Sequence, residues 1–536
     1  MSEPIELAAD YYLNNFKKLT NHAEEWYSDL LSSDEQDWLE RFNGLNHAAQ
    51  CLLVRLLSRK GHWFRSDKLE YKEIPQLAAA LEQLEQEGMV TLNPTISTLL
   101  LAQQLLTKPE LLTLFELSHK SWRKDQLIEQ LPDTAFADFD RLPFDVIELL
   151  HPHVIKLLLA LFFANTHQDL SQFVLDELGL HQFERYQLSQ ARRFFADREQ
   201  VNQLLQLSEL QSLYLESDRK DAQSLYTLLA QMPAAVEHPY VERKRQHLIN
   251  DMARDLERLK CYEQSLHWFK QTRLPPSRER QARIYDALDQ LELMSDVVTN
   301  MTTQPHDLAE QEVAAKLDQR LRRKQGIRVP RVQKPQVVTQ HLELDLTQQR
   351  VEMAVKSHFE SLGYQVYYLE NLLLNGLFGL AYWQAIFAPV EGAFLNRYQY
   401  RPLDLYHADF CSKRQPLLEQ IETHLARHGY AQLKQTYSEK QGINNPFIHW
   451  GLIELDLLEQ CEQHIPISDL LALFKVLLSD IKLFRSGMPD LILFQDGHYR
   501  WLEVKGPGDK VQDNQWRWFA QFKQLNIPFS VAYVNH

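Results

Sequence analysis

One stretch near the end of the chain constrains the fold more than any other: GMPDLILFQDGHYRWLEVKGPGDK, from Gly487 to Lys510. Leu491–Phe494 is a continuous apolar run, as expected for a strand that is buried on both faces. Asp496-Gly497 is typical of a tight two-residue turn. The stretch after the turn alternates with period two, which places Glu503 and Lys505 on one face of a return strand. The sequence therefore predicts a β-hairpin inside a sheet.

This hairpin carries two carboxylates. Asp490 begins the first strand and Glu503 lies in the second, so the fold can bring them side by side. Neighbouring carboxylates repel unless a cation neutralises them, and magnesium or manganese prefers oxygen ligands. Lys505 is then placed to orient or deprotonate a water, or to stabilise charge on a phosphate. The alternative is that Glu503 and Lys505 form only an ion pair on a solvent-facing sheet.

The whole chain has the composition of a soluble multidomain protein. Its 536 residues exceed what one core accommodates, which suggests about three domains. No apolar run is long enough for a membrane span, and the acidic N-terminus does not resemble a signal peptide. The four cysteines lie too far apart for a disulfide framework or a zinc cluster. We expect a cytoplasmic protein, associated with the nucleoid if it is bacterial.

The net charge of −15 argues against a general nucleic-acid coat protein but leaves room for a local basic groove. Residues 1–194 are expected to form a helical DNA-binding region, winged-helix-like or SAP-like. Within it, Lys120, Arg123 and Lys124 lie in a turn between two short helices, where they can contact DNA phosphates. A solvated turn is the alternative.

Residues 195–334 are expected to form helix pairs. The segment DLERLKCYEQSLHWFKQTRLPP resembles a tetratricopeptide repeat, with Ser265 at a close helix contact and Phe269 packed on the neighbouring helix. The basic segment Arg320–Lys334 follows and is interpreted as a solvated linker. The alternative for this segment is a DNA contact that includes Arg322 and Arg323.

Residues 335–536 have a mixed α/β pattern, and their hairpin resembles the PD-(D/E)xK nuclease superfamily. The flanking stretches RSGMPDLILF, WLEVKGPGDK and NQWRW resemble the VRR-NUC domain. YLENLLLNGLFGLAYWQAIFAPVEGAF, PLDL and PFIHW resemble the Fanconi-associated nuclease family. The resemblance implies a multidomain, mostly α protein with a C-terminal α/β, restriction-endonuclease-like nuclease domain. The Val-Arg-Arg pattern behind the VRR-NUC label does not occur in this stretch.

The resemblance also implies roles for particular residues. The metal ligands that it implies are Glu370, Asp490 and Glu503, with the Val504 carbonyl as a further ligand, and Lys505 is the catalytic lysine. The residues that it implies to line the DNA cleft are Asp509, Lys510 and Gln515. Without the resemblance, Glu370 is an ordinary helix-start acid, and Lys510 and Gln515 belong to a helix cap and a solvated face.

The activity that the resemblance implies is a Mg²⁺- or Mn²⁺-dependent nuclease for branched or flap DNA. It cleaves near a 5′ flap, trims 5′ to 3′, leaves 5′-phosphates and acts in the repair of interstrand crosslinks. Two alternatives are a Holliday-junction resolvase and a helical-repeat adaptor that binds DNA without cutting it. The sequence identifies no protein partner and does not decide between a monomer and a homodimer.

Overall fold

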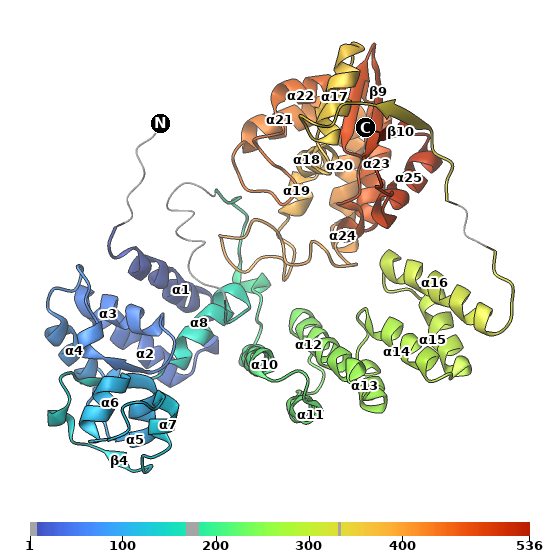
Figure 1. Cartoon of the computed structure of the whole chain (residues 1–536). Coiled ribbons are helices and arrows are strands. Elements are labelled where there is room, and N and C mark those ends of the chain that lie inside the picture. The colour runs from blue at the N-terminus through green and yellow to red at the C-terminus, as the bar shows by residue number, and fades with distance from the viewer. Residues whose placement is uncertain (1–7, 168–181, 331–333, 536) are drawn as a thin grey trace. The chain divides into compact units, whose positions relative to one another are not determined.

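The computed structural model of the chain describes residues 8–167, 182–330 and 334–535 (Figure 1). The chain forms two compact units, Met1–Leu180 with Phe195–Ser208 and His181–Phe194 with Glu209–His536. No helix in the described ranges is both long and apolar enough to cross a membrane.

The first unit begins with helices around a small sheet. Asn46 caps α3 by accepting a hydrogen bond from the Ala49 backbone N–H at 2.9 Å. Helix, strand, helix and strand follow one another in α3, β1, α4 and β2, and a later strand, β5, completes the sheet in the order β1-β5-β2. The elements are α1 (Tyr11–Tyr27), α2 (Ser33–Gly44), α3 (His47–Leu57), β1 (Trp63–Arg65), α4 (Leu77–Gln86), β2 (Val90–Leu92), β5 (Val146–Leu149) and α8 (His153–Phe163).

A second small core of this unit holds the basic turn. The two short helices predicted on either side of the turn are present as α6 (Lys108–Leu114) and α7 (Lys124–Ile128). They pack with the short α5 (Thr98–Leu100) and the two-stranded sheet of β3 (Ile96–Ser97) and β4 (Ala135–Phe136).

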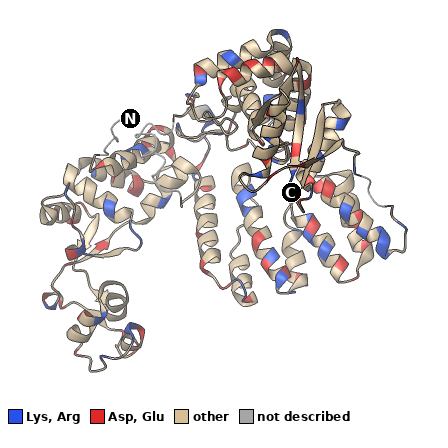
Figure 2. Ribbon diagram, turned by 45° about the horizontal axis from the view of Figure 1, so that its top comes forward, with Lys and Arg blue, Asp and Glu red and all other residues tan. Residues whose placement is uncertain are grey.

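Helix pairs fill the first half of the second unit. Ser265 is buried and its hydroxyl donates to the Ala253 carbonyl at 2.8 Å, while Phe269 is fully buried, as predicted for a repeat contact. Figure 2 shows basic and acidic residues interleaved along these helices. The helices are α10 (Arg198–Glu216), which begins in the first unit, α11 (Ala222–Ala230), α12 (Pro239–Arg258), α13 (Tyr262–Phe269), α14 (Ser277–Ala287), α15 (Leu291–Thr303) and α16 (Leu308–Lys324).

A five-stranded mixed sheet forms the centre of the C-terminal part, in the order β6-β10-β9-β8-β7. β8 pairs antiparallel with both β7 and β9, whereas β10 runs parallel to β9 and β6. The strands are β6 (Thr339–Glu343), β7 (Gln365–Tyr368), β8 (Leu491–Gln495), β9 (His498–Lys505) and β10 (Phe529–Asn535). The helices are α17 (Val351–Ser361), α18 (Leu372–Ala381), α19 (Trp383–Ile386), α20 (Gln415–His428), α21 (Tyr430–Lys440), α22 (Leu455–His464), α23 (Ile467–Ser479), α24 (Ile481–Phe484) and α25 (Asp513–Leu525).

The two faces of this sheet enter different cores. Leu502 and Val504 pack with residues of α17 on one face, and Trp501 packs on the other face with α25 and the remaining helices. Because side chains alternate along a strand, Glu503 and Lys505 point to the same side as Trp501. The alternation predicted for this strand is confirmed.

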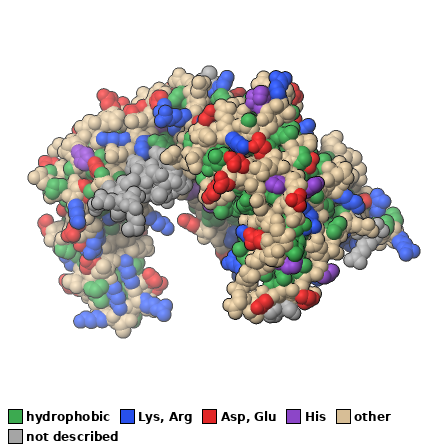
Figure 3. Space-filling model, turned by 90° about the horizontal axis from the view of Figure 1, so that it is seen from above, with side chains coloured by type: hydrophobic (Ala, Val, Ile, Leu, Met, Phe, Trp, Pro, Cys, Tyr) green, Lys and Arg blue, Asp and Glu red, His purple; other side chains and the backbone are tan. Residues whose placement is uncertain are grey.

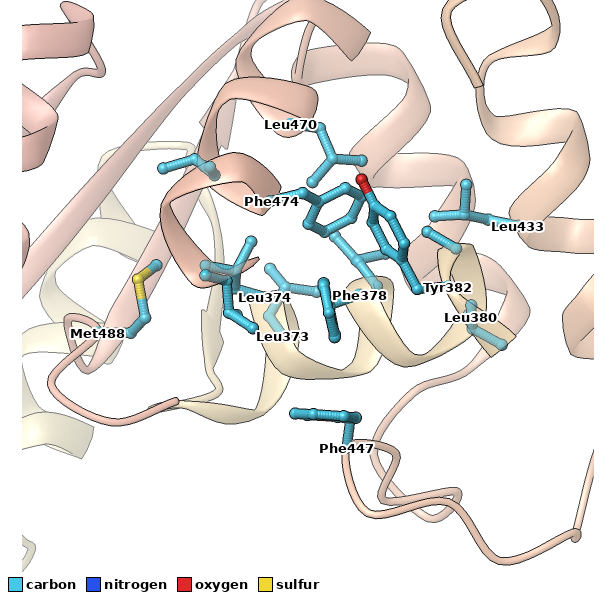
Figure 4. Close-up of a cluster of buried hydrophobic side chains, with 14 of the residues drawn as sticks. Leu373, Leu374, Phe378, Leu380, Tyr382, Leu433, Phe447, Leu470, Phe474 and Met488 are labelled. Atoms are coloured by element: carbon cyan, nitrogen blue, oxygen red, sulfur yellow. The ribbon is translucent and has the colours of Figure 1, made fainter. Parts of the chain in front are cut away.

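Helix α18 forms much of the larger core (Figure 4). The apolar stretch 372–386 divides at Tyr382 into α18 and α19. The Tyr382 ring is buried against Phe378 and Phe474, with ring centroids 4.7 and 5.6 Å away. Gly376 and Gly379 allow the segment 445–453 to lie directly against the helix, since a Cβ on either would come within 2.8 Å of an isoleucine side chain.

A strap formed by residues 182–194 lies on this C-terminal part although it precedes the helix pairs in sequence. The Glu184 carboxylate pairs with the Lys440 ammonium at 2.7 Å. The Tyr186 ring stacks on Phe394 with centroids 3.8 Å apart. The C-terminal part is therefore assembled from two stretches that lie far apart in the chain.

Candidate active site

The β8–β9 hairpin is present as the sequence predicted. Asp496 and Gly497 both have positive φ, 51° and 76°, which is the backbone that a tight two-residue turn requires. The register pairs Leu491 with Leu502. Asp490 therefore lies beside the segment that carries Glu503, and the Val504 N–H donates to Asp490 Oδ2 at 2.8 Å.

Asp490 and Glu503 form a buried pair of carboxyl groups. Asp490 is 9% exposed and Glu503 is fully buried. Burial raises the pKa of Asp490 to about 6, against the lowering effect of the Val504 N–H. Burial, followed by the neighbouring Asp490, raises the pKa of Glu503 to about 8. At neutral pH the two groups resist carrying two full negative charges unless a cation joins them.

Two side chains hold one oxygen of Glu503. Lys505 Nζ lies 2.7 Å from Glu503 Oε1, and the Gln515 amide, from the first turn of α25, donates to the same oxygen at 2.5 Å. Within the described residues, the other oxygen, Oε2, is buried and has no hydrogen-bond partner. A buried carboxylate oxygen without a partner is costly. This free oxygen, beside Asp490, is what a divalent cation would satisfy, so the residues fit a metal ion.

Glu370 lies at the rim of this pair. It is exposed in the turn between β7 and α18, next to Leu369, whose N–H donates to the Asp490 carbonyl at 3.1 Å. Its charge contributes to the raised pKa of Asp490. Across residues 8–167, 182–330 and 334–535, however, no three carboxylate, histidine or cysteine side chains converge closely enough to hold an ion. The structure thus brings together Asp490, Glu503 and Lys505, with Glu370 nearby.

The other predicted residues lie at varied distances from this pair. Lys510 is exposed after the turn in which Asp509 Oδ2 accepts from the Gly506 N–H at 3.1 Å. Arg123 is exposed, and Lys124 donates to the Gln103 carbonyl at 2.9 Å. Their contact with DNA, and the Val504 carbonyl as a ligand, stay predictions.

The interpretation of Arg320–Lys334 as a linker is wrong for its first five residues. Residues 320–324 form the last turns of α16. Lys324 pairs with Asp286 at 2.9 Å, and Arg322 pairs with Asp318 at 2.8 Å, while Arg323 is exposed. The sequence showed the cations but not the carboxylates that the fold places beside them. Residues 331–333 lie outside the described residues.

One cluster of basic residues was not predicted. Arg243 and His247, on α12, lie near His407 and near Lys482 on α24. The pKa of His247 is lowered by burial and then by Arg243, Lys482 and His407. These residues are far apart in sequence, so no local pattern could have revealed the group.

Gly487 fixes the approach of the catalytic loop to α25. Its φ is +94°, and a Cβ there would lie 2.7 Å from the Asn514 backbone. We expect Gly487→Ala to lower the free energy of unfolding by about 2 kcal/mol or more, because the backbone would be strained at this φ and the added Cβ would overlap the Asn514 backbone. We also expect cleavage to fall at least about tenfold, because the distortion lies three residues before Asp490. The matched control is Gly392→Ala, where φ is +70° but no atom lies within 4 Å of the added Cβ. Thermal unfolding and cleavage rates check both variants, and equal effects would contradict this reading.

The raised pKa values predict a pH dependence of stability in the absence of metal. Because the pKa of Asp490 is raised to about 6 and that of Glu503 to about 8, the folded chain holds these protons more tightly than the unfolded chain. This stabilisation is complete near pH 4 and is lost as the pH rises through 6 and 8. In EDTA, the unfolding free energy of the wild type should fall relative to Glu503→Gln by about 2 kcal/mol or more between pH 5.5 and 8.5. Parallel denaturant-unfolding curves for the two proteins would contradict this.

The chain matches three domain families. Residues 10–91 match "FAN1, HTH domain", residues 101–138 match "Fanconi anemia-associated nuclease SAP domain", and residues 430–536 match "VRR-NUC domain".

Curated relatives extend the similarity to nearly the whole chain. The "Fanconi-associated nuclease 1 homolog" of Pseudomonas aeruginosa is 35% identical over 98% of this chain and 95% of its own length. The Homo sapiens "Fanconi-associated nuclease 1" is 23% identical over 98% of this chain, which spans 62% of the human protein.

Two solved structures share the fold. "Crystal structure of paFAN1 bound to 2nt 5'flap DNA with gap" is 34% identical, with a TM-score of 0.86 and 99% of each chain covered. "Crystal structure of paFAN1 bound to 1nt 5'flap DNA with gap" has a TM-score of 0.84, 34% identity and coverage of 98% of this chain and 99% of that chain.

Proposed function

Since this chain belongs to the Fanconi-associated nuclease family, we propose that it is a structure-specific DNA nuclease that cuts near 5′ flaps and trims 5′ ends. Its biological role is then DNA repair, including the repair of interstrand crosslinks. The observation that carries the proposal is the buried Asp490–Glu503 pair with Lys505 Nζ 2.7 Å from Glu503 Oε1. The solved relatives bound to 5′-flap DNA support the choice of substrate.

The cofactor of this site is proposed to be Mg²⁺ or Mn²⁺. Both ions prefer carboxylate and carbonyl oxygens, which is the donor set of Asp490, Glu503, the Val504 carbonyl and Glu370. When bound, such an ion polarises the phosphodiester and stabilises the charge that develops during hydrolysis.

The chain's own residues hold the remaining parts of the site in place. Lys505 carries a positive charge at Glu503 Oε1, where it can also donate to an oxygen of the scissile phosphate. Gln515 fixes the same carboxylate oxygen and so leaves Oε2 as the atom that would hold a cation.

DNA binding must depend on local groups of cations, because the chain has a net charge of −15. Figure 3 shows Lys, Arg, Asp and Glu side chains mixed over the visible face. Arg243 and Lys482, which both lie near His247, form one local group of cations, which we propose to contact backbone phosphates. Lys120 and Arg123 form another: both are exposed, and neither has a carboxylate within ion-pair distance among residues 8–167.

The Lys120 and Arg123 contacts can be tested through salt dependence. Replacing both by glutamine should weaken flap-DNA binding and lower the slope of log affinity against log salt by about 1 to 2, since each phosphate contact contributes roughly 0.9. The control is Arg283→Gln, which removes a cation already paired with Glu279 at 2.7 Å. Titration of labelled flap DNA at several salt concentrations measures both slopes, and an unchanged slope in the double variant would identify the turn as solvated.

The proposed activity is tested with end-labelled flap, fork, four-way-junction and single-stranded DNAs, with and without Mn²⁺. The expected result is preferential cutting near the 5′ flap with 5′-phosphate products. Paired symmetrical cuts confined to the four-way junction would instead indicate a resolvase. Tight binding of flap DNA without cleavage under any metal condition would indicate a non-cleaving adaptor.

A further inference from the structure

We propose that Asn371 is a positioning residue of the metal centre, which fixes Glu370 at a set distance from Asp490. The inference rests on the proposed metal-dependent nuclease and concerns a residue that the sequence did not single out. Asn371 directly follows Glu370 and precedes α18. Its side chain connects the turn that carries Glu370 to the loop that carries Asp490.

The connection consists of two hydrogen bonds from one amide group. The Asn371 Nδ2 donates to Glu370 Oε1 at 3.1 Å, and its Oδ1 accepts from the Met488 N–H at 3.0 Å. Met488 lies two residues before Asp490 in the chain. The amide therefore uses its donor on one candidate ligand and its acceptor on the backbone that leads to the other.

A second asparagine ties the same two segments together. Asn375, one turn later on α18, donates to the Arg485 carbonyl at 2.9 Å and to the Asn371 carbonyl at 2.5 Å. On the other side of the turn, the Leu369 N–H donates to the Asp490 carbonyl at 3.1 Å. The start of α18 is thus bound to the loop 485–490 at three points, and Asn371 alone among them touches the Glu370 side chain.

The Asn371 side chain restricts the conformations that Glu370 can adopt. Glu370 is an exposed side chain near a second anion, so without support it would sample several rotamers and turn away from Asp490. Removing a group that hydrogen-bonds to a metal ligand, without binding the metal itself, typically weakens metal binding by about 10–100-fold. Asn371 has the geometry of such a group.

The alternative is that Asn371 only satisfies the backbone. Its φ is +54°, in the left-handed region that asparagine tolerates better than most residues. Glycine adopts this conformation without strain, so Asn371→Gly removes both side-chain hydrogen bonds and keeps the turn. Asn526, at the end of α25 with φ 57°, provides the matched control Asn526→Gly.

The experiment measures Mn²⁺ binding by titration calorimetry without DNA, on the full chain. We expect Asn371→Gly to weaken Mn²⁺ binding by about tenfold or more, with Asn526→Gly within about twofold of the wild type. The Mn²⁺ concentration for half-maximal flap cleavage should shift by the same factor, while the rate at saturating Mn²⁺ and the DNA affinity in EDTA change much less.

An Mn²⁺ affinity equal to that of the wild type in Asn371→Gly would overturn the proposal. If that variant did not fold in metal-free buffer, Asn375→Ala would replace it, since alanine favours the helix and removes the contact with Arg485. We expect several-fold weaker Mn²⁺ binding in Asn375→Ala, and an unchanged affinity would again overturn the proposal. Because the readout is metal binding, failure here is distinct from absence of nuclease activity in the wild type.

Discussion

Asp490→Ala and Lys505→Ala are each expected to reduce flap cleavage by about 10³-fold or more while leaving DNA affinity within a few-fold of the wild type. Asp490 is one of two buried carboxylates that face the proposed cation, and Lys505 is the cation that contacts Glu503 Oε1. Affinity changes little because it comes from phosphate contacts elsewhere on the chain.

Single-turnover cleavage and equilibrium binding of the same labelled flap DNA measure the two effects separately. Lys523→Ala, an exposed lysine on α25, serves as the control for loss of one positive charge. Circular dichroism should establish that Lys505→Ala is folded, because the variant leaves the buried Glu503 beside Asp490 with Gln515 as the remaining donor to its Oε1. Cleavage at close to the wild-type rate by either variant would show that the site has been assigned to the wrong residues.

Removal of divalent metal is expected to abolish cleavage completely, and Mg²⁺ or Mn²⁺ should restore it. Without a cation, Glu503, whose pKa is raised to about 8, holds a proton at neutral pH beside the Asp490 carboxylate, and Oε2 of Glu503 has no partner within the described part of the chain. Metal that binds only the folded chain also stabilises it, by about 2.7 kcal/mol at 100 times the dissociation constant.

Thermal unfolding in EDTA and in saturating Mn²⁺ measures this stabilisation without any substrate. The wild type should unfold at a higher temperature in Mn²⁺, and Glu503→Gln should lose most of that increase because it retains the hydrogen bonds but not the charge. Robust cleavage after exhaustive chelation would rule out a metal-dependent mechanism. Equal stabilisation of both proteins would place the ion elsewhere.

The sequence predicted the parts of the site that depend on local patterns. Strand alternation, the Asp496-Gly497 turn and a short connection together determine that Asp490 lies beside Val504 and Glu503. These features involve residues close in sequence, whose spacing directly sets their positions in a hairpin.

Contacts between distant segments were not predictable in this way. The hydrogen bond from Gln515 to Glu503 depends on where α25 packs, and the pairing of Lys324 with Asp286 depends on how α16 lies against α14. No periodicity in the sequence predicts either contact. The contact of Asn371 with Met488 is of the same kind, because the two residues lie far apart in the chain.

The strap of residues 182–194 has a consequence for how the catalytic part can be cut from the chain. A fragment that starts at residue 335 would lack the Glu184 carboxylate that holds Lys440 and the Tyr186 ring that covers Phe394. It would leave an aromatic surface open to water and an ammonium group without its anion. The nuclease fold is thus discontinuous in sequence. A truncated gene or a transplanted domain that contained only the residues from 335 onward would lack the part of the fold formed by residues 182–194.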